Sequence, residues 1–286
     1  MKIITTIDEL QTVVKEMKTQ KKQIGFVPTM GFLHEGHRAL MKQARKENDV
    51  VVLSIFVNPL QFGPNEDLES YPRDFARDQR AAEAEGVDLI FHPTPAEMYP
   101  EELSVTMQVK KRTDALCGAS RPGHFDGVAT VLTKLFHLVQ PDRAYFGKKD
   151  AQQAAVVDGL VTDLNFPLQV VPVDTVRELD GLAKSSRNIY LTEKERMEAP
   201  YLYRSLQDAE EMIKSGENNP EIVVSAIKDK ILTETSGEID YVSLLSYPNL
   251  ETITEIQDTY IIALAVKFSK ARLIDNIIRT KEQEEV

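Results

Sequence analysis

The chain has 286 residues, of which 42% are hydrophobic and 28% are charged. This length and balance exclude a disordered chain and allow a sizeable core, in one large domain or two smaller ones. The formal net charge of -11 disfavours a basic surface for nucleic acid and non-specific binding to anionic membranes, so cations that bind a polyanion must be gathered locally.

The chain contains one cysteine, Cys117, which excludes an intrachain disulfide and agrees with a reducing cytosol. Residues 1–11 lack the continuous apolar core of a secretory signal peptide. The longest strongly apolar run, residues 50–57, is too short to span a bilayer. These features predict a soluble cytoplasmic protein without a membrane or nucleic-acid partner.

Segments typical of strands and of helices alternate from residue 23 to residue 173. The strand-like segments are 23–28, 50–57, 87–91, 143–146 and 168–173, and the helix-like segments are 36–47, 73–85, 125–139 and 151–164. Repeated strand–helix–strand units imply a parallel sheet with right-handed crossovers. We therefore expect an α/β fold, with a Rossmann-like parallel sheet and helices on both faces.

The later part of the chain changes character. Helix-like stretches at 192–215 and 220–234 are followed by strand-like runs at 241–245, 260–266 and 271–277. This order is typical of an α+β domain. We therefore expect a Rossmann-like domain in residues 1–176 and a smaller α+β C-terminal domain in residues 177–286.

The segment PTMGFLHEGH, residues 28–37, leaves the first expected core strand and enters the first expected helix. A helix N-terminus offers unpaired N–H groups and a partial positive charge, which suit phosphate. His34 and His37 are three residues apart, so both can face one side of the turn and donate to phosphate oxygens. The alternatives are two surface histidines in a glycine-rich turn, or a metal site, although zinc-protease helices space their histidines by four.

Four further polar segments carry residue types that suit a phosphate or a hydroxy acid. They are NPLQFGP at 58–64, RPGHFDG at 121–127, GKKDAQQ at 147–153 and KSSRN at 184–188. Each of them alone can be a solvated turn or linker, and for 58–64 and 147–153 that is the favoured interpretation of the isolated segment. However, three of them, like residues 28–37, follow the carboxyl ends of expected strands, which meet at one edge of a parallel sheet. The sequence therefore predicts a phosphate-binding crevice at that edge.

In this order, the segments resemble the pantothenate synthetase family of the HIGH-motif nucleotidyltransferase superfamily. The resemblance is carried by PTMG and HEGH within 28–37, FVNPLQF at 56–62, RPGHF at 121–125, FGKKDAQQ at 146–153, and VRE at 176–178 followed by SSRN at 185–188. It covers nearly the whole chain. Residues 184–188 stand where related adenylyl-transferring enzymes carry their KMSKS loop.

The resemblance implies a role for each matched residue. The implied ATP contacts are Met30, Gly31, Phe32, Leu33, His34, Glu35, Gly36, His37, Gly147, Lys148, Lys149, Asp150, Val176, Lys184, Ser185, Ser186 and Arg187. The implied substrate contacts are Gln61 and Gln153 for pantoate, Gln61 also for β-alanine, and Asn58, Arg121 and His124 along the same cavity. His37 is implied to be the catalytic proton donor, and His34 and Lys149 complete the catalytic set.

The chain departs from the family at Lys148, where many members have glutamate, so the role of that side chain stays open. The family also implies a homodimer and Mg²⁺ delivered with ATP. The implied reaction forms pantothenate, AMP and pyrophosphate from ATP, pantoate and β-alanine through a pantoyl adenylate. Because an adenylate hydrolyses readily, we expect the C-terminal domain to form a lid over the site, with residues 184–188 as the moving part.

Three other hypotheses stand beside this one. The first is a metal-dependent hydrolase that uses His34, His37, His124 and Asp150, although the other matched loops have no role in it. The second is a nucleotide-binding sensor without turnover, which the retained His, Lys and Gln residues argue against. The third is a sister enzyme that adenylylates a different hydroxy acid.

Overall fold

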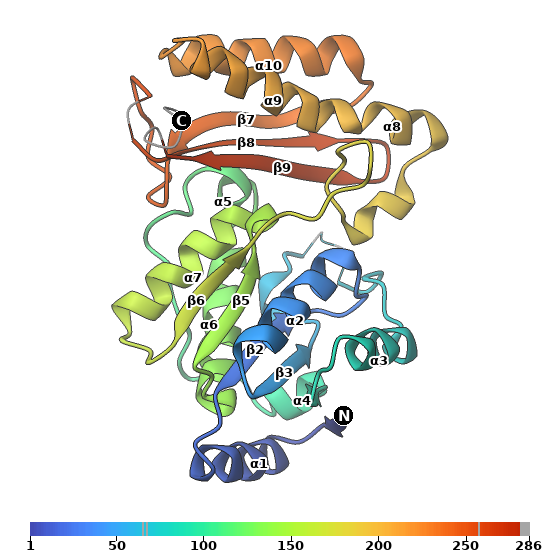
Figure 1. Cartoon of the computed structure of the whole chain (residues 1–286), viewed down its shortest axis with the longest axis vertical. Coiled ribbons are helices and arrows are strands. Elements are labelled where there is room, and N and C mark those ends of the chain that lie inside the picture. Colours follow the sequence, from blue (N-terminus) through green and yellow to red (C-terminus); the bar gives the residue numbers. More distant parts are fainter. Residues whose placement is uncertain (65, 67, 257, 281–286) are drawn as a thin grey trace. The chain divides into compact units, whose positions relative to one another are not determined.

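The computed structural model describes residues 1–64, 66, 68–256 and 258–280 (Figure 1). Contacts divide the chain into two compact units. Unit 1 comprises Met1–Lys110, Arg121–Lys148 and Val156–Asp174, and unit 2 comprises Lys111–Ser120, Lys149–Ala155 and Thr175–Val286. The chain passes from unit 1 to unit 2 for the last time between residues 174 and 175, close to the domain boundary expected at residue 176. Two short earlier segments, 111–120 and 149–155, also belong to unit 2.

Unit 1 is built on a six-stranded parallel sheet, which confirms the expected α/β class. The strand order is β1-β4-β3-β2-β5-β6. The strands are β1 (Lys2–Ile4), β2 (Ile24–Thr29), β3 (Val50–Ile55), β4 (Leu89–Phe91), β5 (Arg143–Gly147) and β6 (Gln169–Val173). Because β3, β2, β5 and β6 are parallel neighbours, the segments that follow them leave from one edge of the sheet.

Helices flank the sheet of unit 1. They are α1 (Ile7–Thr19), α2 (Glu35–Glu47), α3 (Phe75–Ala84), α4 (Pro95–Met98), α6 (His124–Val139) and the part of α7 (Ala151–Asp163) that belongs to this unit. Neighbouring β2 residues point to opposite faces: Val27 shares a buried cluster with Met41 of α2, whereas Phe26 meets Phe136 of α6 edge-on at 6.4 Å. Burial on both faces explains why every residue of β3 except Ser54 is apolar.

Unit 2 contains a three-stranded antiparallel sheet in the order β7-β8-β9. Its strands are β7 (Glu238–Ser246), β8 (Tyr260–Lys267) and β9 (Arg272–Arg279), and its helices include α5 (Leu116–Ser120), α8 (Glu193–Glu198), α9 (Pro200–Lys214) and α10 (Pro220–Glu234). α9 and α10 cover one face of this sheet (Figure 1). The other face packs against Leu116 and Ala151. Within the described ranges, no helix is both long enough and apolar enough to cross a membrane.

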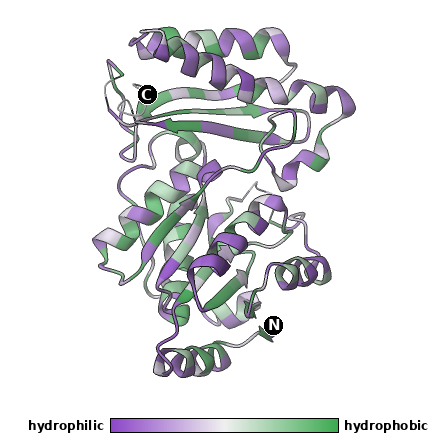
Figure 2. Cartoon of the chain, viewed as in Figure 1, coloured by the Kyte–Doolittle hydropathy of each residue, from purple (hydrophilic) through white to green (hydrophobic). Residues whose placement is uncertain are grey.

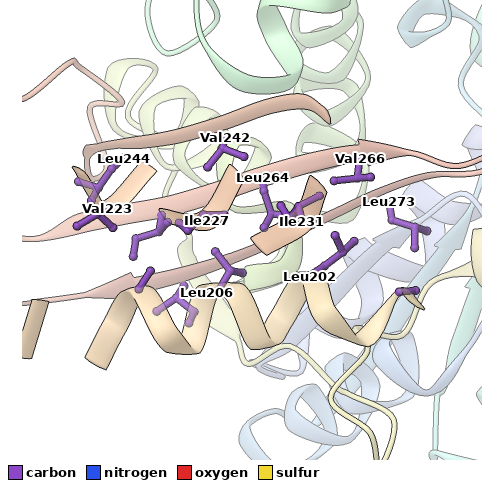
Figure 3. Close-up of a cluster of buried hydrophobic side chains, with 14 of the residues drawn as sticks. Leu202, Leu206, Val223, Ile227, Ile231, Val242, Leu244, Leu264, Val266 and Leu273 are labelled. Atoms are coloured by element: carbon purple, nitrogen blue, oxygen red, sulfur yellow. The ribbon is translucent and has the colours of Figure 1, made fainter. Parts of the chain in front are cut away.

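The core of unit 2 follows from the spacing of its apolar residues. Leu202 and Leu206 lie one turn apart on α9, and Val223 and Ile227 lie one turn apart on α10. These side chains pack with Leu264 and its neighbours on the sheet (Figure 3). Hydrophobic and hydrophilic residues alternate along both helices (Figure 2), as expected for helices with one buried face.

The single helical stretch expected at 192–215 is wrong in one respect, because the structure divides it into α8 and α9. The division falls at Pro200, which opens α9 as its first residue. Proline lacks the N–H group that would continue a preceding helix, but it suits the first turn of a new one. The strand β1 and the helices α1, α4 and α5 were not expected from the sequence.

Replacement of Leu264 by alanine should lower the free energy of unfolding by about 2–5 kcal/mol, because this fully buried side chain would leave a cavity in the unit 2 core. Urea unfolding followed by circular dichroism measures this change. Leu232→Ala is the control, since Leu232 on α10 is 64% exposed and should change stability by less than about 0.5 kcal/mol. Equal losses in the two variants would contradict the assigned core.

Candidate active site

The turn that joins β2 to α2 has an unusual backbone. Gly31 has φ +83° and Phe32 has φ +50°, so two successive residues lie in the left-handed region. That region costs a residue with a side chain about 1–2 kcal/mol. A Cβ at position 31 would also lie 2.9 Å from Oδ2 of Asp78 and 3.0 Å from Cγ2 of Ile55. Both the φ angle and the space therefore require glycine at position 31.

Asp78 of α3 contacts this turn through its carboxylate. Oδ2 accepts the N–H of Phe32 and Oδ1 accepts the N–H of Leu33, each at 2.7 Å. Asp78 is 1% exposed. Burial raises the pKa of the Asp78 carboxyl, and the N–H groups of Leu33 and Phe32 act in the opposite direction. The guanidinium of Arg77 lies 4.7 Å from the centre of the Phe32 ring.

His34 and His37 meet at the start of α2. The Nδ1 atom of His34 accepts the N–H of Gly36 at 3.1 Å, and Nδ1 of His37 accepts the N–H of His34 at 3.2 Å. The two rings are 4.1 Å apart between centroids. Because each Nδ1 is an acceptor, the proton of each neutral ring is on Nε2, the nitrogen that can donate to an anion. A Cβ at Gly36 would lie 2.8 Å from Cε1 of His34, so the ring needs glycine beneath it.

Asn58 and Gln61 form a buried polar cluster beside the short helix η1 (Pro59–Gln61), which follows β3. The amide of Asn58 donates to Oε1 of Gln61 at 3.2 Å and to the carbonyl of Gly127 at 3.1 Å. The amide of Gln61 lies 3.3 Å from Sδ of Met30. Burial raises the pKa of the Tyr99 hydroxyl, which donates to Oδ1 of Asn58 at 2.8 Å. The structure therefore brings together three of the predicted residues within unit 1, namely Met30, Asn58 and Gln61.

Arg121 and His124 are joined to the same cluster. Nδ1 of His124 donates to the carbonyl of Gln61 at 2.8 Å, and Arg121 lies with Nη1 3.1 Å from Nε2 of His124. His124 thus carries its ring proton on Nδ1, the opposite tautomer to His34 and His37. Glu66 accepts from Nε of Arg121 at 2.7 Å and also pairs with Nη2. A hydrogen bond from Arg121 lowers the pKa of Glu66.

The lowered pKa of Glu66 predicts an acid-sensitive contribution to stability. Since the folded-state pKa lies below the unfolded one, the contribution is present above the ordinary glutamate pKa of about 4.3 and is lost as pH falls through the folded value. Glu66→Gln should remove this contribution, which for a partly exposed pair is about 1 kcal/mol or less. Urea unfolding between neutral and acidic pH measures it. Arg121→Met should flatten the same pH dependence, and an unchanged pH dependence in both variants would contradict the assignment.

Within unit 2, Lys149 and Ser185 line one small cavity of about 10 Å³, together with Asn188. The Lys149 side chain is 18% exposed, and Nζ lies 4.0 Å from Oδ2 of Asp150. The carbonyl of Lys149 accepts from Nδ2 of Asn276 on β9 at 2.8 Å. Because this bond is made by the backbone carbonyl, it does not depend on the conformation of the Lys149 side chain.

The loop that resembles KMSKS is held by bonds inside unit 2. Lys184 pairs with Glu178 at 2.7 Å, and its N–H donates to the carbonyl of Val176 at 2.9 Å. Ser185 caps the short helix η3 (Ser186–Tyr190) by accepting the N–H of Arg187 at 3.3 Å. Nδ2 of Asn188 donates to the carbonyl of Ala183 at 3.0 Å, which ties the two ends of the loop together.

The remaining predicted residues lie as follows. Gly147 ends β5, and Lys148 pairs with Asp174 at 2.6 Å in unit 1. Asp150 closes the short helix η2 (Lys148–Asp150), and Gln153 lies half-buried on α7 in unit 2. Leu33 is 2% exposed, so only its backbone can meet a ligand. The role of the Lys148 side chain stays open, since an ion pair with an exposed aspartate does not decide whether this lysine also contacts a ligand.

The metal-hydrolase hypothesis finds no support in this geometry. Among the described residues, no three His, Cys, Asp or Glu side chains converge as a metal site. Nδ1 of His34 and of His37 is used by backbone N–H groups, and Nε2 of His124 faces a guanidinium. A cation at His124 would be repelled by that guanidinium.

Sequence reasoning missed Glu66, Asp78 and Tyr99, which contact the predicted residues directly. Asp78 lies 45 and 46 residues from its two partners in the turn, on a helix that carries several other charges. A buried carboxylate on such a helix looks the same in sequence as a solvated one. No motif in the sequence distinguished Tyr99 from other aromatic residues.

Comparison with known proteins identifies the family of this chain. The chain matches the family model of pantoate-beta-alanine ligase over residues 2–278. It is 59% identical over 280 residues to a pantothenate synthetase of Bacillus anthracis (strain A0248), covering 98% of this chain and 99% of the relative. It is 60% identical over 277 residues to a pantothenate synthetase of Geobacillus sp. (strain WCH70), covering 97% and 98%.

Solved structures give the same result. Pantothenate synthetase from Thermus thermophilus is similar with a TM-score of 0.91 and 46% identity, covering 97% of this chain and 99% of that one. Pantoate-beta-alanine ligase from Francisella tularensis, complexed with beta-gamma ATP and beta-alanine, is similar with a TM-score of 0.79 and 33% identity, covering 97% of both chains.

Proposed function

Since this chain belongs to the pantoate–β-alanine ligase family, we propose that it condenses pantoate with β-alanine at the expense of ATP. The products are pantothenate, AMP and pyrophosphate, and the intermediate is pantoyl adenylate. The observation that carries the proposal is the pair of histidines at the start of α2, whose Nε2–H groups are fixed as donors by the bonds at Nδ1. A helix N-terminus with two such donors suits a phosphate.

In the first half-reaction, a carboxylate oxygen of pantoate attacks the α-phosphorus of ATP. A P–O bond forms, the bond to the β-phosphate breaks, and pyrophosphate leaves with the electron pair. The attacking and leaving groups are both anionic, so the protein must supply positive charge and in-line positioning. His34 and His37 of unit 1 are proposed to donate hydrogen bonds from Nε2 to phosphate oxygens, with His37 as the catalytic donor, and the neutral rings keep their protons.

In the second half-reaction, the amine of β-alanine attacks the carbonyl carbon of the adenylate. A C–N bond forms, the C–O bond to AMP breaks, and the nitrogen loses a proton. Neither half-reaction needs a covalent enzyme intermediate, so Cys117 has no role in this chemistry.

The remaining assignments are proposals supported by residue type and by the family. ATP contacts are proposed for Met30, Gly31, Phe32, Leu33, Glu35, Gly36, Gly147, Lys148, Lys149, Asp150, Val176, Lys184, Ser185, Ser186 and Arg187, and substrate contacts for Asn58, Gln61, Arg121, His124 and Gln153. The buried amides of Asn58 and Gln61 support a hydroxy-acid site, because they donate and accept without adding negative charge near a nucleotide.

Magnesium is proposed to arrive with ATP. In the part of the chain that the structure describes, no group of three His, Cys, Asp or Glu forms a protein metal site. Mg²⁺ keeps several waters and commonly binds through substrate phosphates, so it does not require such a group. No step above is assigned to it.

The test is pyrophosphate release with ATP, Mg²⁺ and pantoate, with and without β-alanine. Release that depends on pantoate, together with pantothenate formation when β-alanine is added, is expected. Absence of pantoate-dependent pyrophosphate release would contradict the proposal. It would favour the alternative of a nucleotide-binding sensor without turnover. Replacement of pantoate by related hydroxy acids separates this activity from that of a sister enzyme. The homodimer, the cytoplasmic location and the lid role of residues 177–286 stay predictions.

A further inference from the structure

A buried carboxylate clamps the turn that precedes α2. The two oxygens of Asp78 accept the N–H groups of Phe32 and Leu33, each at 2.7 Å, and the residue is 1% exposed. We propose that Asp78 is a positioning residue, which sets the geometry of this turn for ATP without touching the nucleotide. The inference rests on the proposed use of the turn in ATP binding.

The turn needs such a clamp because its backbone is in a disfavoured conformation. Gly31 and Phe32 have φ +83° and +50°, and the left-handed region is unfavourable for a phenylalanine. Packing does not fill the space beside the turn, since a cavity of about 180 Å³ is lined by Met30, Gly31, Phe32 and Asp78 among others. Hydrogen bonds to an ionised acceptor are among the strong ones, so two of them can hold a strained turn.

The position of the turn determines where the rings of His34 and His37 lie. Leu33, whose N–H is bound by Asp78, directly precedes His34, the N-cap of α2. The N–H of His34 in turn donates to Nδ1 of His37 at 3.2 Å. A shift of the Leu33 amide would therefore move both rings together. Small displacements of positioned groups are costly in phosphoryl transfer.

The geometry calls for a carboxylate rather than an amide. A carboxylate offers two acceptor oxygens, whereas asparagine of the same size offers one oxygen and one NH2 group. Asp78→Asn would therefore point a donor at one of the two N–H groups of the turn. The negative charge of Asp78 is tolerated near a phosphate site because these N–H groups and the guanidinium of Arg77 stabilise it.

The experiment measures ATP binding to Asp78→Asn and to the wild type by calorimetry in the absence of pantoate. ATP affinity should fall about 10- to 100-fold, the scale of a misplaced catalytic group. In turnover assays, kcat should fall and KM for ATP should rise, while KM for β-alanine is unchanged. In ¹⁵N spectra, the amide signals of Phe32 and Leu33 should move.

Glu85→Gln is the matched control. Glu85 is a buried carboxylate that directly follows α3, and it accepts from Arg38 on α2 at 2.6 Å. Glu85 thus connects the end of α3 to α2, whereas among the described residues the N–H groups of Phe32 and Leu33 are bonded by Asp78. Both variants should lose some stability in urea, and only Asp78→Asn should lose ATP affinity.

Two results would overturn the inference. One is an ATP affinity of Asp78→Asn equal to that of the wild type. The other is an equal loss of ATP affinity in Glu85→Gln, which would reduce Asp78 to a structural contact. A wild type that binds ATP but releases no pyrophosphate would defeat the proposed function instead, and the comparison of ATP affinities would still decide the role of Asp78.

Discussion

Replacement of His37 by asparagine should lower kcat/KM for pantoate-dependent pyrophosphate release by about 10²–10³, the typical effect of removing one preorganised donor. The asparagine oxygen lies close to the position of Nδ1 and can still accept the N–H of His34, so the start of α2 is kept. The group at Nε2 is lost. Single-turnover measurement of adenylate formation assigns the loss to the first half-reaction.

Two further variants separate the roles of the two ring nitrogens. His37→Gln places its amide near the position of Nε2, so it should retain part of the rate although the cap is weakened. His137→Ala is the surface control, because His137 is exposed near the end of α6 and its ring bonds the Thr133 carbonyl of the same helix. Unchanged turnover in His37→Asn would remove His37 from the mechanism.

Replacement of Lys149 by methionine should lower kcat/KM by a similar factor of about 10²–10³, because the variant keeps the length of the side chain but removes its charge. The bond from Asn276 to the Lys149 carbonyl does not depend on the side chain, so the local fold should persist. Pyrophosphate release at saturating and limiting ATP shows whether the loss lies in ATP binding or in the chemical step.

Lys194→Met is the control for this variant. Lys194 also belongs to unit 2, is 73% exposed and pairs only loosely with Glu198 at 3.6 Å. Its replacement should leave turnover unchanged. If Lys149→Met turned over ATP as fast as Lys194→Met, the charge of Lys149 would have no part in catalysis.

The alternation of strands and helices was predictable because it follows from local patterns. A run of β-branched apolar residues indicated β3. The helix expected at residues 220–234 has the same bounds as α10 in the structure. The order of strands in the sheet was not predictable, because it depends on which strands pair across long stretches of chain. β1 was missed since its three residues are too few to show a period, and α5 since it has only five.

The contacts within the candidate site were predictable where both partners lie in one short segment. His34 and His37 are close in sequence, and their contact follows from helix geometry. The carboxylates that hold the site were not predictable, because Glu66 and Asp78 reach partners far away in the chain. Charged side chains are usually expected to be exposed to solvent. Only the tertiary structure shows that each of these carboxylates has a partner within the protein.

The hydrogen bonds at Nδ1 of His34 and His37 fix the tautomer of both rings. A neutral ring whose Nδ1 accepts a backbone N–H carries its proton on Nε2, where it can donate a hydrogen bond. Loss of that proton would leave an imidazolate, so the neutral ring keeps its proton and acts on an anion as a hydrogen-bond donor. The ring nitrogens that close the first turn of α2 therefore also decide which nitrogen each histidine presents as a donor.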